Sequence, residues 1–297
     1  MISAHISGII KGVKSIMFEG IGAFFSRLWT DISGWFVNLY DQFCFVFVEK
    51  DRYKQMFTGL GNTLKITGGA LLVGIVIGIV VAAIRSSYDK NKEDLKKKGG
   101  AGRFFMGLLN GICKVYLTVI RGTPVVVQLM ISYFLIFVSA QNGVLVGIFA
   151  FGINSGAYVA EIFRGGIMSV DEGQFEAGRS LGFGYVGTMW HIVLPQAFKT
   201  VLPTLCNEFI ALLKETSVAG YVGVIDLTKA GNVIAGRTYQ YFIPLITVAI
   251  IYLAIVMIMS WLSGKLERRL RKSDRRDRKS TRLNSSHLWL SRMPSSA

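Results

Sequence analysis

The stretch from Glu172 to Ala197 reads EGQFEAGRSLGFGYVGTMWHIVLPQA, a polar and glycine-punctuated island between long apolar segments. Residues 174–181 are mostly good helix formers, and Gly182-Phe183-Gly184 then breaks the helical pattern. A second helical piece is predicted from Tyr185 to Val193, ending at Pro195. The stretch therefore predicts two short helices joined by a glycine turn, lying between two membrane spans.

The rest of the chain has the composition of a polytopic membrane protein. Its 297 residues have a mean hydropathy of +0.46 and include several long uncharged runs. A net charge of +15 would suggest nucleic-acid binding in a soluble protein. Here, however, the Lys and Arg residues flank apolar segments, as the positive-inside rule describes, so no nucleic-acid partner is expected.

The hydropathy pattern predicts an all-α fold with five transmembrane helices, since about 20 apolar residues cross a bilayer. Arg121-Gly122-Thr123-Pro124 is expected to break the second helix, because proline removes a backbone donor. The predicted spans are Ile66–Ile84, about Phe105 or Leu108 through Val138, Val144–Phe163, Thr200–Val222 and Phe242–Leu262.

The distribution of basic residues predicts the orientation of these spans. Arg85–Arg103 contains seven Lys or Arg residues and Lys265–Lys279 contains nine, so both segments are expected in the cytoplasm. Five spans then place the amino terminus outside and the carboxyl terminus inside. The same topology places Glu172–Ala197 in the cytoplasm.

The chain divides into four predicted parts. Residues 1–54 form an extension that suits one or two amphipathic helices at the membrane interface, although 32–48 could be a weak span instead. Residues 55–264 form the transmembrane domain, and 265–279 form a basic cytoplasmic tail. Residues 280–297 are rich in serine, show no helical period, and are expected to be a non-native tail.

The island resembles the EAA loop of ATP-binding-cassette (ABC) importer permeases. In that family Glu-Ala-Ala is followed by a glycine and then by Ile-x-Leu-Pro. The corresponding residues here are Glu176-Ala177-Gly178, then Gly182, then Ile192-Val193-Leu194-Pro195. Gly178 stands where the second alanine is usual, which is expected to loosen this helix by up to about 1 kcal/mol.

The resemblance extends to the polar-amino-acid subfamily of these permeases. It includes the order of motifs from Ala157 to Asn232 and the sequence RGTPVVVQL from Arg121. The likeness implies a permease subunit that imports a polar amino acid across the cytoplasmic membrane of a prokaryote. It also implies two ATP-binding-cassette ATPase subunits, a second permease subunit, identical or not, and an extracytoplasmic solute-binding protein.

The chain itself contains no G-x-x-x-x-G-K-[ST] nucleotide loop. Nucleotide is therefore expected to bind a partner, and this chain is expected to be a transport subunit rather than an enzyme. Its cysteines, Cys44, Cys113 and Cys206, are widely spaced in apolar surroundings and are expected to be free thiols. Neither a cofactor nor a metal site is expected.

The resemblance assigns roles within the loop. Glu176 and Arg179 are expected to make polar contacts with the ATPase, and Gly182 is expected to allow the sharp turn. Leu181 and Ile192 are expected to hold the hairpin against the membrane domain. The full set expected to couple the permease to the ATPase is Glu176, Ala177, Arg179, Leu181, Gly182, Ile192 and Pro195.

Polar residues within the spans are candidates for the substrate path, because such groups in a membrane need partners or water. Arg121 either reaches toward a membrane surface or lines a water-filled path. Intramembrane charges and a broken span also suit an ion-coupled secondary transporter or channel for small polar solutes, which is the alternative function. The path candidates are Arg121, Asn154, Asn207 and Glu208.

Overall fold

The computed structural model describes residues 26–90 and 101–290, with residues 271–290 described by their backbone alone. Nearly all of these residues are helical, and none of them forms a strand, as predicted for an all-α protein. After a first helix over 26–43, the elements are η1 (Cys44–Val48), η2 (Glu49–Asp51), α2 (Tyr53–Lys90), α4 (Ala101–Gly122), α5 (Val125–Ile131), η3 (Ser132–Ile136), α6 (Gly143–Met168), α7 (Glu172–Ser180), α8 (Tyr185–Thr188), η4 (Met189–Val193), α9 (Leu194–Glu215), η5 (Thr216–Val222), α10 (Leu227–Thr238) and α11 (Phe242–Leu290).

The predicted spans coincide with these helices. Four helices in the described residues are long and apolar enough to cross a membrane: Tyr53–Lys90, Gly102–Gly122, Gly143–Met168 and Phe242–Leu270. A shorter apolar segment, Val125–Ile136, continues the second span beyond its break at Pro124, as predicted. The predicted fourth span is occupied by α9 and η5, which carry more polar residues.

The central pair of helices is α2 and α6. A Cβ atom added to Gly74 would lie 3.0 Å from Ser155 Oγ, and one added to Gly78 would lie 2.5 Å from Val159 Cγ1. Glycine at these two positions therefore lets the helix axes approach closely. This glycine face packs within one chain.

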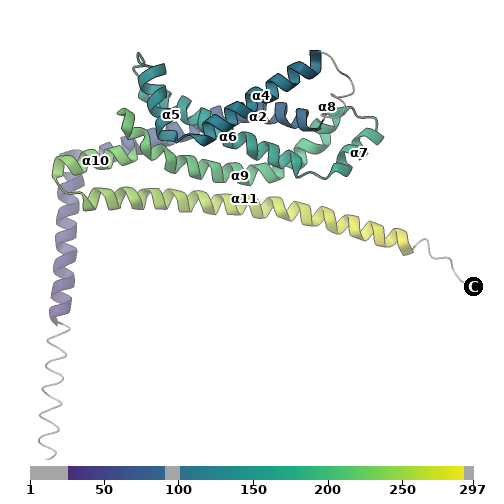
Figure 1. The fold of residues 1–297 in the computed structure, drawn as a ribbon. Coiled ribbons are helices and arrows are strands. Elements are labelled where there is room, and N and C mark those ends of the chain that lie inside the picture. Colours follow the sequence, from purple (N-terminus) through teal and green to yellow (C-terminus); the bar gives the residue numbers. More distant parts are fainter. Residues whose placement is uncertain (1–25, 91–100, 291–297) are drawn as a thin grey trace, which may run out of the picture.

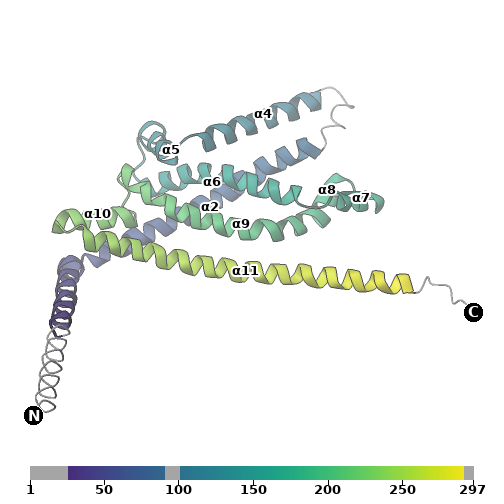
Figure 2. The same cartoon turned by 60° about the horizontal axis from the view of Figure 1, so that its bottom comes forward.

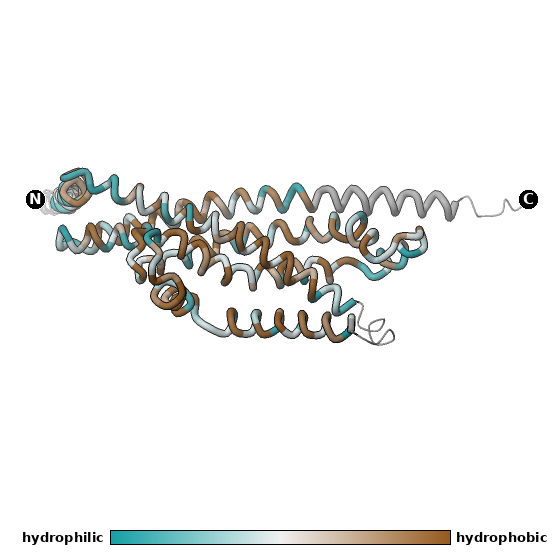
Figure 3. Tube along the Cα trace, turned by 90° about the horizontal axis from the view of Figure 1, so that it is seen from above, coloured by the Kyte–Doolittle hydropathy of each residue, from teal (hydrophilic) through white to brown (hydrophobic). Residues whose placement is uncertain are grey.

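The bundle is elongated, with different elements at its two ends (Figures 1 and 2). The α7 end holds α7 and α8, and the α10 end holds α5 and α10, while α11 runs along the side of the bundle next to α9. Helix 26–43 leaves the α10 end and runs crosswise to the bundle. Figure 3 shows that hydrophobic residues predominate along the middle of the bundle.

One sequence prediction about a helix end is wrong. The second helical piece of the loop does not end at Pro195, because the chain keeps helical dihedral angles from Met189 (φ −58°, ψ −49°) through Leu194 (φ −59°, ψ −42°) into α9. Pro195, which has no N–H to donate, directly follows the wider π-helical turn η4, in which the Leu194 N–H donates to Met189 O. Helix α11 continues to Leu290, so residues 280–290 of the serine-rich segment are helical, and the prediction that this segment is non-native stays a prediction.

Candidate functional site

Helix α7 is defined by strong capping at both ends. At its start, the Asp171 side chain accepts a hydrogen bond of 2.7 Å from the Gly173 N–H. At its end, Gly182 adopts φ 81°, where only glycine is unstrained. The N–H of Gly182 donates to Arg179 O at 2.9 Å and that of Phe183 donates to Gly178 O at 3.0 Å, which together form a Schellman motif.

One face of α7 is docked on the bundle. Phe175 is buried and packs in a cluster whose other buried members are Ile167, Val170, Val193 and Ala197. A hydrogen bond of 3.1 Å from Gln196 Nε2 to Gln174 Oε1 links α7 to α9. These contacts hold α7 against the ends of α6 and α9.

Leu181 does not have the anchoring role expected from the sequence. Its side chain is 73% exposed, whereas Ile192 is half-buried. Phe175 and Val193 hold the hairpin to the bundle instead.

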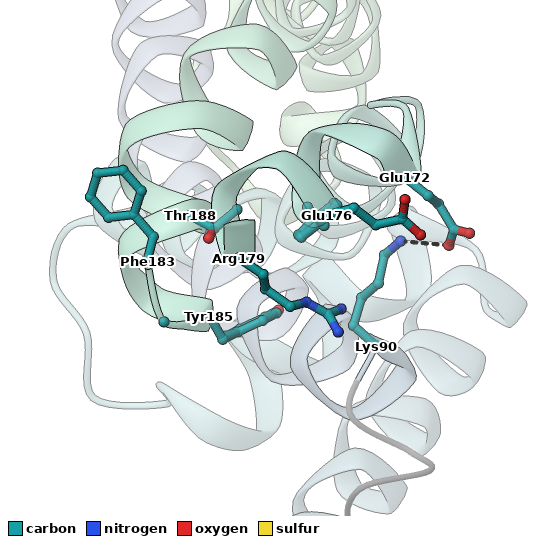
Figure 4. A pocket seen from close by; sticks show the side chains of 9 residues that line it. Lys90, Glu172, Glu176, Arg179, Phe183, Tyr185 and Thr188 are labelled. Atoms are coloured by element: carbon teal, nitrogen blue, oxygen red, sulfur yellow. Dashed lines mark hydrogen bonds and ion pairs between the residues drawn. The ribbon is translucent and has the colours of Figure 1, made fainter. Parts of the chain in front are cut away.

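A cavity of about 390 Å³ lies between α7, α8 and the last turn of α2. Lys90 Nζ lies 3.1 Å from Glu172 Oε1 and 4.6 Å from the centroid of the Phe175 ring, as Figure 4 shows for the ion pair. Glu176 and Arg179 also line this cavity and are exposed. Neither side chain has an ion-pair partner within the part of the chain that the structure describes.

Further ion pairs join α2 to α6 close to the α7 end. Arg85 and Glu161 approach to 2.7 Å, and Arg164 lies 3.0 Å from Asp89. Within α6, Arg164 also lies 3.7 Å from Glu161. Burial raises the pKa of the nearby Tyr185 phenol, which therefore stays protonated at neutral pH. Sequence reasoning missed these pairs, although Arg85 and Glu161 each stand at the end of a long uncharged run.

Asn154 is brought together with a residue that sequence reasoning missed. It is 3% exposed and donates from Nδ2 to Gln128 Oε1 at 3.0 Å. Gln128 Nε2 in turn donates to Ile120 O at 2.7 Å and to Thr123 O at 3.1 Å. The Gln128 amide thus ties α6 to the free carbonyls at the break between α4 and α5.

Glu208 and Arg121 also meet α6, at different places. Ser155 Oγ donates to Glu208 Oε1 at 2.9 Å. The Arg121 guanidinium lies 5.5 Å from the Tyr158 ring centroid and lines a cavity of about 470 Å³ together with Arg85, Lys114 and Glu161. Asn207 is exposed and makes no hydrogen bond to these residues.

The fold and the loop can now be compared with known proteins. The profile of the family described as "Binding-protein-dependent transport system inner membrane component" matches residues 99–272. The chain belongs to this family. The matched region runs from α4 to α11 and includes the whole of the α7 and α8 loop.

Relatives of this permease have names that refer to amino acids. A putative glutamine transport system permease protein of Rickettsia bellii is 36% identical over 211 residues, which cover 70% of this chain and 89% of the relative. The arginine transport system permease protein ArtQ of Bacillus subtilis is 36% identical over 219 residues, covering 73% of this chain and 92% of ArtQ.

Solved structures show the same architecture. A crystal structure described as an amino acid ABC transporter with histidines matches with a TM-score of 0.63 and 36% identity, covering 75% of this chain and 98% of its own. The MetNI methionine ABC transporter matches with a TM-score of 0.61 at 18% identity and supports the fold alone. The all-α permease fold predicted from the sequence is therefore confirmed.

Proposed function

We propose that this chain is the permease subunit of an ATP-driven importer that moves a polar amino acid across the cytoplasmic membrane. One observation carries the proposal: α7 is fixed to the bundle by Phe175 yet presents Glu176 and Arg179, both exposed and without ion-pair partners among the described residues. A docked helix with unpaired charges is suited to a polar protein interface. The names of the amino acid permeases among its relatives support the substrate class.

The partners follow from the same surface. Two ATPase subunits bind the α7 end of two permease subunits, and a solute-binding protein delivers the amino acid at the α10 end. The α7 end faces the cytoplasm in this proposal, because the basic segments Arg85–Arg103 and Lys265–Lys279 flank the spans on that side. The amino terminus is then outside and the carboxyl terminus inside.

Movement of α7 is passed to the spans through packed contacts. Lys90, at the end of α2, lies 4.6 Å from the centroid of the Phe175 ring of α7, whereas its pair with the 85% exposed Glu172 is screened by solvent. The Arg85–Glu161 pair joins the same end of α2 to α6, so the two helices move as one body. Closure of the ATPases around ATP then tilts this body and switches the path between inward-open and outward-open states. The permease itself makes and breaks no covalent bond.

The substrate path follows the polar residues of α6 and its neighbours. Asn154 and Tyr158 are one helical turn apart, so they share one face of α6. Arg121 stacks on Tyr158, and Glu208 accepts a hydrogen bond from Ser155. A zwitterionic amino acid carries both charges that these groups can bind. Asn207, next to Glu208, stays a candidate for the same path.

Uptake in proteoliposomes tests the proposal. The permease is reconstituted with its ATPase and solute-binding protein, and ATP hydrolysis and radiolabelled amino-acid uptake are measured for wild type and Glu176→Lys. A matched pair, Glu176→Gln and Glu172→Gln, separates loss of an interface charge from loss of charge in general. Glu172 already pairs with Lys90 and is the control.

We expect Glu176→Lys to abolish ATP-dependent uptake while the chain still inserts, and Glu176→Gln to reduce uptake more than Glu172→Gln does. Solute movement by the permease alone down an ion gradient, indifferent to Glu176, would instead support the secondary transporter.

A further inference from the structure

Helix 26–43 has two chemically different sides. At 100° per residue, one side gathers polar groups and the other gathers large apolar and aromatic groups. Many of the apolar side chains remain uncovered, with Trp29 73%, Phe36 59% and Tyr40 68% exposed. The polar side carries Arg27, Thr30, Asp31, Asn38 and Asp41, and the apolar side carries Leu28, Trp29, Ile32, Phe36, Leu39, Tyr40 and Phe43. Trp35 and Val37 lie at the two borders, and Ser33 is the one polar residue within the apolar side.

A sharp turn at Lys50 and Asp51, called the elbow below, sets the crosswise direction of this helix. Lys50 and Asp51 adopt positive φ angles of 56° and 54°, a conformation that costs about 1 kcal/mol or more for each non-glycine residue. Such strain persists only where other contacts enforce it. Arg52 Nη1 donates to Phe45 O at 2.7 Å, and Lys54 pairs with Asp51 at 2.6 Å. The turn is therefore a fixed part of the fold.

The segment between helix 26–43 and the elbow, η1 (Cys44–Val48), is embedded in the α10 end of the bundle. Val46 is 0% exposed and Phe47 is 3% exposed. They belong to a buried cluster with residues from α2, α10 and α11, namely Met56, Leu227, Ala230, Ile234, Ile243 and Val248. The base of the helix is thus part of the core, while the rest of it extends beyond the bundle (Figure 2).

We propose that helix 26–43 lies in the headgroup layer of the membrane at the α10 end, with its apolar side in the boundary of the acyl chains. The spans α2, α6 and α11 run across the membrane, so a helix crosswise to them at one end lies in the membrane plane. Trp and Tyr are the aromatic residues that favour this layer. The occupant of the apolar side is lipid.

The lipid contact has a consequence for α10. Since Val46 and Phe47 pack on Leu227 and Ile234, anchoring helix 26–43 in the headgroup layer fixes the depth of α10 at the membrane surface. The proposed function places the α10 end, and with it helix 26–43, at the outer leaflet of the membrane. The contact with lipid does not rest on that orientation.

Accessibility of spin labels tests the proposal on the full chain in phosphatidylcholine/phosphatidylglycerol vesicles. Cys44, Cys113 and Cys206 are first replaced by alanine. Single cysteines are then introduced as Phe36→Cys on the apolar side and Asn38→Cys on the polar side. Reference labels are Ile250→Cys on the exposed side of α11 and Ser180→Cys on α7.

We expect the label at 36 to be accessible to oxygen like that at 250. The label at 38 should be about fivefold or more accessible to a water-soluble nickel chelate than the label at 36. A second pair, Ile32→Cys and Asp41→Cys, should repeat this contrast.

Two results would overturn the lipid contact. Nickel accessibility like that of Ser180→Cys at both positions would mean that the helix projects into water. Low accessibility to both reagents at both positions would mean that protein covers it, such as a second copy of the chain. Chelate added to one side of the vesicles reads the leaflet, so a reversed leaflet would contradict the proposed orientation while leaving the lipid contact intact.

Discussion

Thr188 occupies the space beside Gly178: its Oγ1 and Cγ2 atoms both lie 2.6 Å from the position that a Cβ on residue 178 would take. Thr188 comes from α8 and is 1% exposed. The glycine that departs from the EAA pattern is thus explained, because a neighbouring side chain fills the volume of the usual alanine methyl group. The loosening expected from glycine in α7 is offset by this contact.

Gly178→Ala is therefore expected to destabilise the permease. The gain in helix propensity is about 1 kcal/mol, but overpacking against a short, buried, β-branched side chain costs about 1–3 kcal/mol. Chemical unfolding in mixed micelles measures the net loss. The double variant Gly178→Ala/Thr188→Ala should recover most of it, while Gly178→Ala/Thr188→Val should not, since valine keeps the volume of threonine. Equal recovery by both would show that the crowding is not the cause.

The turn after α7 provides a second test with a matched glycine. Gly182 has φ 81° and Gly184 has φ −70°, and neither would bring a new Cβ within 4 Å of another group. Gly182→Ala is expected to lower the free energy of unfolding by about 1 kcal/mol through backbone strain alone. Gly184→Ala should change it by less than about 0.5 kcal/mol. If the two variants unfold alike, the left-handed residue does not control this turn.

The Gln128 amide predicts a defect at the broken span. Gln128→Leu leaves the Asn154 amide without its acceptor and the Ile120 carbonyl without its donor. Unsatisfied buried groups of this kind cost about 1–3 kcal/mol, so we expect a loss of that size together with reduced uptake. The neighbouring Val127→Ala, at a 46% exposed position, is the control and should change stability by less than about 0.5 kcal/mol. If Gln128→Leu kept the stability and the uptake of the wild type, the role of this amide would be contradicted.

The Arg85–Glu161 pair predicts a measurable coupling energy between α2 and α6. Their side chains are 15% and 30% exposed, so solvent screens them only in part. Glu161→Gln is expected to cost about 1–3 kcal/mol, because the guanidinium keeps its charge and loses its partner. The double variant Arg85→Gln/Glu161→Gln should be less destabilised than the sum of the single variants.

The control for this test is Glu172→Gln, which breaks a pair whose carboxylate is 85% exposed and should cost little stability. Additive single effects would mean that the two charges are not coupled.

The sequence alone was sufficient for the features that depend on local pattern. Uncharged runs of about 20 residues predicted the spans, and Pro124 predicted the break because proline lacks an N–H wherever it stands. Gly182 predicted the end of α7 for a similar reason, since the left-handed conformation favours glycine in any fold. The spacing of the EAA loop, together with the order of motifs around it, was sufficient to predict the permease fold.

Only the tertiary structure decided which residues meet. Periodicity places a side chain on a face of a helix, but it does not say what that face contacts. The Arg85–Glu161 pair joins residues 76 positions apart, and Asn154 finds its acceptor in a different helix. The exposure of Leu181 and the direction of helix 26–43 likewise depend on turns whose outcome is fixed by packing with distant segments. The sequence therefore determined the helices and the loop. The packing of α2, α6 and α9 determined which side chains contact one another.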